Sequence, residues 1–206
     1  MQERFRFSIK LCMIGNLLFV AFGLVCAIFY KTYEPRSALS GFLEFVAYLV
    51  EASGFGTLVF ADYVIFTSVR DRNIMKISFS LYILLEGIMM FLELNSYKFE
   101  FYKPYSLLLA ITHSTLSALV CLSFLQFEPD NKKYEPIIIA CSAIIFCGMF
   151  GSIMHIRIYF SIIVNAAAFA ILFYMTQRLL EKEELSVDCH GDRATVTEYP
   201  NSFFKD

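Results

Sequence analysis

The chain has 206 residues, of which 58% are hydrophobic and 17% are charged, and its mean hydropathy is +0.60. This apolar share exceeds that of ordinary soluble domains. The net charge is -2, so basic residues do not outnumber acidic ones, and we expect no nucleic-acid partner. The charges cluster, and the apolar runs between them have the length of membrane-spanning helices.

Six apolar runs follow one another through short polar connections, and each predicts a transmembrane helix. No stretch remains for a sizeable soluble domain. We therefore expect an all-α integral membrane protein, a six-transmembrane helix bundle over residues 1–178, followed by a polar cytosolic tail, 179–206. The first run is too long for a signal-peptide core and is interpreted as an uncleaved signal anchor. The predicted spans are about 9–30, 42–68, 75–95, 105–126, 136–154 and 156–177.

The basic residues predict how these spans are oriented. Twelve of the 17 Lys and Arg residues fall on the side that would carry both termini, and the other five fall opposite. Because positive charge is enriched in cytoplasmic loops, both termini are predicted to be cytosolic. On that side, the candidates for contacts with partners are Arg70, Arg72, Lys132 and Lys133, together with the tail.

Acidic residues interrupt two of the apolar runs. In the second run, Glu44, Glu51 and Asp62 are separated by seven and eleven residues, which places all three on one stripe of a helix. In the third run, Glu86 and Glu93 are again seven apart. A carboxylate at the bilayer centre costs about 3 kcal/mol on insertion scales, so these side chains must face protein, water or the interface. Glu44 and Glu93 are close enough to the ends of their runs to be interfacial.

The fourth run adds His113 in a group of hydroxyl side chains, and the sixth run carries Asn165. These positions leave three interpretations open: hydrogen-bonded groups that hold the bundle in register, a proton or cation path, or contacts with lipid headgroups. We call the four central candidates the polar seam: Glu51, Asp62, Glu86 and His113.

Catalytic signatures are missing from the sequence. The three histidines are far apart, and no G-x-S-x-G elbow, phosphate-binding glycine loop or Cys-x-x-Cys pair occurs. We therefore expect no catalytic residues, no metal site and no cofactor, and a protein that is not an enzyme. A lipid-modifying enzyme that uses His113 or a buried acid is the remaining catalytic alternative.

Several short motifs occur in an order that is typical of one family. The first is Pro35-x-Ser37-x-x-x-Gly41-Phe42-Leu43, and the second runs from Glu86-Gly87 to Phe99-Glu100. His113 with Ala118-Leu119-Val120-Cys121, and the run from Ala168 to Tyr174, complete the order. In these motifs the chain resembles the DRAM/Sfk-type family of six-span membrane proteins, the damage-regulated autophagy modulators and their relatives. Glu51 and Asp62 have no counterpart in the family pattern.

The resemblance implies six spans, cytosolic termini and a non-enzymatic role in lysosomal, endosomal or plasma membranes. We therefore expect a multi-pass membrane modulator or adaptor in autophagy or membrane trafficking. The alternative is a small proton- or cation-conducting channel or transporter that uses the intramembrane acids. The partners expected are membrane lipids and cytosolic or membrane proteins, and self-association is left open.

Overall fold

The computed structural model describes residues 2–32, 37–69, 73–94, 102–124, 134–153 and 158–181. These residues form six helices, and each helix overlaps one of the six predicted apolar runs. The prediction of an all-α fold is therefore confirmed. The helices are α1 (Gln2–Thr32), α2 (Ala38–Ser68), α3 (Asn73–Leu94), α4 (Tyr102–Ser123), α5 (Glu135–Ile153) and α6 (Ile158–Glu181).

Four of these helices are long and apolar enough to cross a membrane. They provide the segments Glu3–Thr32, Ala38–Ser68, Ile74–Leu92 and Phe160–Glu181. In α4 and α5 the described apolar segments are shorter, Ile111–Ser123 and Glu135–Cys147. By length and composition the chain is a membrane protein with at least these four candidate spans.

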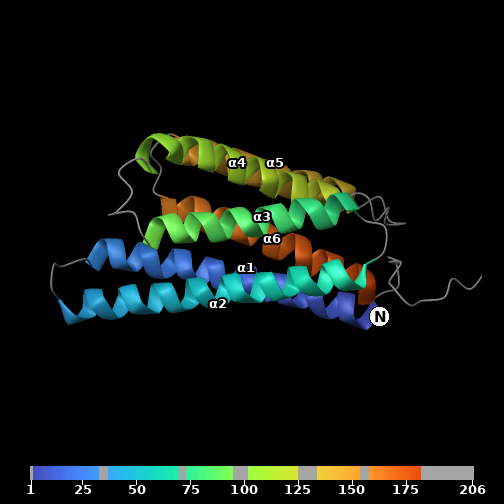
Figure 1. Cartoon of the computed structure of the whole chain (residues 1–206), viewed down its shortest axis with the longest axis horizontal. Coiled ribbons are helices and arrows are strands. Elements are labelled where there is room, and N and C mark those ends of the chain that lie inside the picture. Colours follow the sequence, from blue (N-terminus) through green and yellow to red (C-terminus); the bar gives the residue numbers. More distant parts are fainter. Residues whose placement is uncertain are drawn as a thin grey trace, which may run out of the picture.

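The helices run side by side along the long axis of the molecule, with α1 and α2 as the longest pair (Figure 1). Each helix packs against its neighbours in the chain, and α1 also packs along α6, so that the six helices close into a ring. Among the six pairs of this ring, contact is most extensive between α1 and α2 and least extensive between α2 and α3.

The α1–α2 interface explains why these two helices lie so close together. The buried residues of α2 recur every three or four positions, which forms one stripe along the helix. At Gly54 in this stripe, an added Cβ would lie 3.3 Å from the carbonyl oxygen of Gly15 on α1. Small residues at a helix crossing let two backbones approach in this way. From Ala47 onward the stripe consists of Ala47, Glu51, Gly54, Leu58, Ala61, Ile65 and Ser68.

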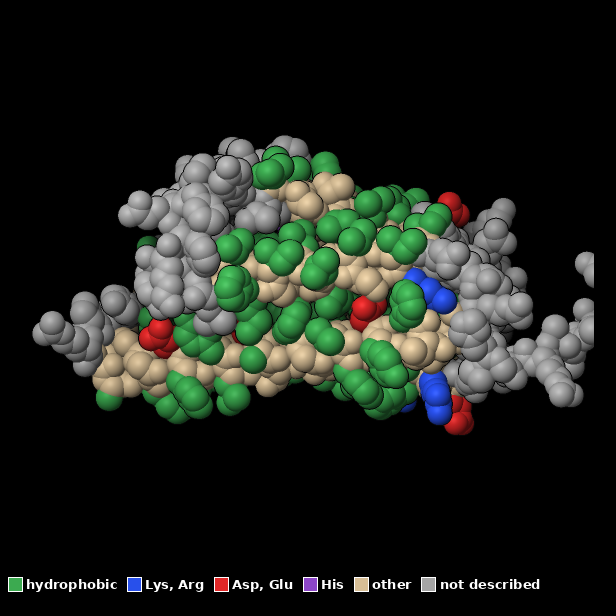
Figure 2. Space-filling model, in the orientation of Figure 1, with side chains coloured by type: hydrophobic (Ala, Val, Ile, Leu, Met, Phe, Trp, Pro, Cys, Tyr) green, Lys and Arg blue, Asp and Glu red, His purple; other side chains and the backbone are tan. Residues whose placement is uncertain are grey.

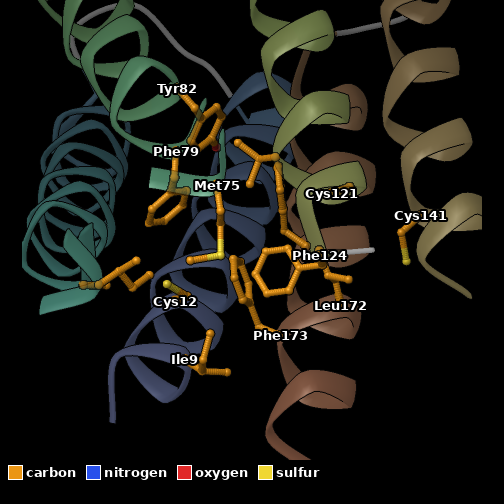
Figure 3. Close-up of a cluster of buried hydrophobic side chains, with 14 of the residues drawn as sticks. Ile9, Cys12, Met75, Phe79, Tyr82, Cys121, Phe124, Cys141, Leu172 and Phe173 are labelled. Atoms are coloured by element: carbon orange, nitrogen blue, oxygen red, sulfur yellow. The ribbon is translucent and has the colours of Figure 1, made fainter. Parts of the chain in front are cut away.

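The apolar core of the described residues fills the half of the bundle where α1 begins and α6 ends. Aromatic side chains from α3, α4 and α6 point toward one another there (Figure 3). The ring of Phe173 makes edge contacts with Phe79 at 6.3 Å and with Phe124 at 5.6 Å between centroids. At the same end, Arg6 on α1 donates to the carbonyl oxygen of Leu180 in the last turn of α6, at 2.5 Å.

Candidate functional site

An acid and an imidazole meet between α3 and α4, near the middle of both helices. His113 Nε2 lies 2.6 Å from Glu86 Oε1. The two side chains are only 16% and 19% exposed, respectively. A contact this short requires one proton between the two atoms, carried by either the imidazole or the carboxyl group. The pair therefore joins two helices and holds a proton away from bulk water.

Tyr82 completes this pair from α3. It lies one helical turn before Glu86, so the two side chains are on the same face of α3. Its ring packs against His113, with 5.4 Å between the ring centroids, and against Phe169 on α6 at the same separation. Tyr82 is 4% exposed. The pair therefore rests directly on the aromatic core, and Tyr82 can be seen at the edge of that core (Figure 3).

The hydroxyl groups near His113 form hydrogen bonds within their own helix. Thr112, Thr115 and Ser117 each donate to a backbone carbonyl four residues earlier in α4, at 2.7 to 2.8 Å. Such bonds satisfy the hydroxyl groups within their own helix. Ser117 donates to the backbone oxygen of His113, which leaves the imidazole itself for Glu86.

A second polar contact links α2 to α3 through Asp62. Ser80 Oγ lies 3.1 Å from Asp62 Oδ1 and 3.0 Å from Oδ2, so the serine hydroxyl donates to the carboxylate across the α2–α3 interface. The Asp62 side chain is partly buried. This link gives the acid a donor on the neighbouring helix, in the helix pair with the least extensive contact.

The acids of α2 share one edge of the helix, as predicted, but their surroundings differ. Glu51 is 7% exposed and lies in the buried stripe with Gly54 and Leu58, which pack on α1. Glu44 is exposed. The structure thus brings Glu86 and His113 of the polar seam together, joins Asp62 to Ser80, and places Glu51 in the stripe that packs on α1.

Other predicted residues lie elsewhere. The basic candidates on the predicted cytosolic side, Arg70, Arg72, Lys132 and Lys133, are outside the described residues, as is the side chain of Glu93. Asn165 on α6 is partly buried, and within the described part of the chain its Oδ1 accepts no hydrogen bond. Residues 182–206 of the predicted tail are also outside the described residues, whereas 179–181 form the end of α6.

Sequence reasoning missed Tyr82 and Ser80 as members of the polar site. The spacing of Tyr82 from Glu86 places both on one helical face and could have indicated their contact. No such spacing links Ser80 to Asp62, because that contact depends on how α2 and α3 pack. Within the described ranges, no three His, Cys, Asp or Glu residues are grouped so that they could hold a metal ion.

The fold and the site together define an all-helical membrane protein with a buried acid–imidazole pair. Comparison of the chain with family models, with curated proteins and with solved structures finds no match. The likeness of its short motifs to the DRAM/Sfk-type family therefore stays a prediction.

Proposed function

We propose that this chain is a non-enzymatic multi-pass membrane modulator or adaptor, acting in autophagy or in endolysosomal or plasma-membrane trafficking, as its resemblance to the DRAM/Sfk-type family implies. One observation carries the proposal: two intramembrane acids are already engaged by a side chain on the neighbouring helix. Glu86 contacts His113 and Asp62 accepts from Ser80. Such pairs hold helices in register, which leaves the ends of the bundle for interactions with partners.

The proposal includes six spans with both termini in the cytosol. An even number of antiparallel spans brings both ends of the chain to one side, and the distribution of Lys and Arg assigns that side to the cytosol. Two features of the helices support it. At about 1.5 Å per residue, the 22 residues of α4 and the 19 residues of α5 are each long enough to cross most of a bilayer core. Both helices also complete the ring with the other four.

Under this proposal, partners bind the cytosolic connections. The basic groups Arg70 with Arg72, and Lys132 with Lys133, suit acidic protein segments or anionic lipids. The tail beyond Leu180 adds a polar segment of both charges.

The test is autophagic flux in cells that lack the chain and are supplied with variants. Wild type and the double variant Glu51→Gln/Glu86→Gln should restore flux equally. Truncation after Leu180, or Arg70→Ala with Arg72→Ala, should reduce the restored flux by at least half at equal membrane abundance. Equal flux with and without the wild-type chain would refute the autophagic role. A loss confined to the Gln variant would refute the adaptor model.

A second function is favoured by the same acid–imidazole pair. Glu86 and His113 share a proton near the middle of their helices, which is where a proton relay would place a titratable pair. Purified protein in liposomes, followed with proton- and K⁺-sensitive dyes, separates the two functions. A flux that Glu51→Gln/Glu86→Gln abolishes would establish conduction, whereas folded protein with no flux above empty liposomes would leave the acids structural.

A further inference from the structure

An apolar groove lies on the surface between α2 and α3. Its volume is about 460 Å³. Leu84, Ile88 and Phe91 are 43% to 60% exposed along it, so it opens toward the surroundings of the bundle. Because α2 and α3 are both membrane-length helices, this opening faces lipid chains. The lining consists of Phe55, Ser80, Ile83, Leu84, Gly87, Ile88, Phe91 and Leu92.

The groove has the length of one lipid chain. From Ser80 to Leu92 it follows α3 for twelve residue-to-residue steps, which is about 18 Å at 1.5 Å per residue. One leaflet contributes about half of the 30 Å hydrocarbon core, or about 15 Å. Near the middle of the groove, Gly87 lets the ring of Phe55 pack closely on α3, because a Cβ there would lie 3.0 Å from Cζ of Phe55.

One end of this groove is polar. Ser80 lines it, and the Ser80 hydroxyl donates to the carboxylate of Asp62, which adjoins the groove through this hydrogen bond. A carboxylate has about four acceptor positions, and within the described residues the Ser80 hydroxyl is the donor that reaches it. An ionised or partly buried carboxylate at this depth needs further N–H or O–H donors.

A positive charge lies one helical turn nearer the end of the bundle. Lys76 is four residues before Ser80, which is about 6 Å along α3. The side chain is mostly buried, and its ammonium lies over the ring of Phe66, 5.5 Å from the centroid. Acidic and basic side chains lie close together between α2 and α3 on a face that is otherwise largely hydrophobic (Figure 2).

We propose that this groove binds a phosphosphingolipid, with its sphingoid chain along α3, its backbone N–H and hydroxyl donating to Asp62, and its phosphate at the level of Lys76. The assignment needs only that α2 and α3 lie in a bilayer and is independent of the proposed function. In this lipid class the N–H and O–H donors lie between the chain and the phosphate. Along α3, the protein presents the matching groups in the same order: the apolar groove, then the Asp62 carboxylate, then the Lys76 ammonium.

The same order argues against other lipids. A glycerophospholipid presents ester oxygens at the level of Asp62, and these only accept hydrogen bonds, so the carboxylate would be desolvated without a donor. A simple long-chain amine would satisfy Asp62 but would place no phosphate near Lys76. The distinction predicts selectivity between sphingomyelin and phosphatidylcholine, which carry the same headgroup and differ in the donors beneath it.

The experiment uses a single tryptophan as reporter, because the chain contains none. Leu84→Trp places it on the exposed wall of the groove, and Phe60→Trp places it on α2 outside the groove lining. Each full-length protein is reconstituted in phosphatidylcholine vesicles that contain a fixed fraction of chain-spin-labelled sphingomyelin or chain-spin-labelled phosphatidylcholine. We expect sphingomyelin to quench the groove reporter at least twofold more strongly, and both lipids to quench the Phe60→Trp reporter equally.

The reporter is then combined with Asp62→Asn, and with Glu44→Gln as an exposed acid on the same helix. Asp62→Asn should remove the preference for sphingomyelin, whereas Glu44→Gln should retain it. Equal quenching by the two lipids at the groove would overturn the assignment, as would a preference that survives Asp62→Asn or disappears in both variants. Should Asp62→Asn fail to fold, the comparison between the two reporter positions still decides, since an equal preference at Phe60→Trp would refute a groove site.

Discussion

Glu86 shows how a single acidic residue can be kept inside an apolar bundle. Its carboxylate contacts His113 Nε2 on the next helix, and the ring of Tyr82 packs against that imidazole from the helix of Glu86. Leaving any member of such a group unpaired exposes the others to an apolar environment, where an unsatisfied polar group is unfavourable. The pairing therefore predicts energetic coupling between the two side chains.

A double-mutant cycle measures this coupling. Glu86→Leu and His113→Leu should each destabilise the bundle, and the double variant should lose less than the sum of both. We expect a coupling free energy of about 1–2 kcal/mol, from reversible unfolding in mixed micelles with increasing denaturing detergent. Glu44→Leu is the control, because Glu44 is exposed, and it should change the free energy of unfolding by less than about 0.5 kcal/mol. Additive single effects would show that the contact does not stabilise the fold.

The sequence could indicate which residues are polar and intramembrane, but not their partners. The seven- and eleven-residue spacings placed Glu44, Glu51 and Asp62 on one edge of α2 because helical geometry is regular. Glu44 is exposed, Glu51 is buried and Asp62 is partly buried, because the neighbouring helices α1 and α3 cover different parts of that edge. Such packing is set by contacts between distant residues, such as Asp62 with Ser80, and no local pattern encodes it.

At the scale of helices, the α1–α2 pair depends on the absence of a side chain at Gly54. An added Cβ would meet the Gly15 carbonyl oxygen, Leu18 and Phe19 at 3.3 Å, whereas one at Gly56 would meet no atom within 4 Å. Gly54→Val should therefore separate the helices and reduce the free energy of unfolding by about 1–3 kcal/mol, measured in the same micelles. The same change at Gly56 should have less than about 0.5 kcal/mol effect. Equal losses at the two glycines would contradict the close crossing.

The contact between α1 and α6 gives a second prediction for helices. Arg6 brings a positive charge to the carbonyl end of α6, where the helix dipole is negative. Arg6→Gln should destabilise the last turn of α6 by about 1 kcal/mol and accelerate amide exchange there. Hydrogen exchange with mass spectrometry measures this, and Arg4→Gln serves as the control because Arg4 is exposed on the same helix. Unchanged exchange in α6 would mean that the Arg6 contact contributes nothing to its end.

For the whole molecule, hydrophobic runs predicted all six helices, because an apolar run bounded by charges leaves the backbone few alternatives in a membrane. The closing of the ring by α1 and α6 could not be predicted in this way. It joins segments from opposite ends of the chain, and their pairing depends on side-chain shape rather than on composition. The number of bilayer crossings, six or four, is a separate property. It decides on which side of the membrane the connection between α4 and α5 lies.

The connection between α4 and α5 lies on opposite sides of the membrane in the two topologies. With six spans it is cytosolic, whereas with α4 and α5 on the lumenal side it would be lumenal. Lys133→Thr completes an N-glycosylation acceptor at Asn131, and Tyr97→Thr completes one at Asn95 in the preceding connection. With flexible residues inserted around each acceptor, we expect a glycan at Asn95 and none at Asn131, read as a mobility shift that glycosidase removes. A glycan at both asparagines would refute six spans, because the two connections flank α4 and can share the lumenal side only if α4 does not cross.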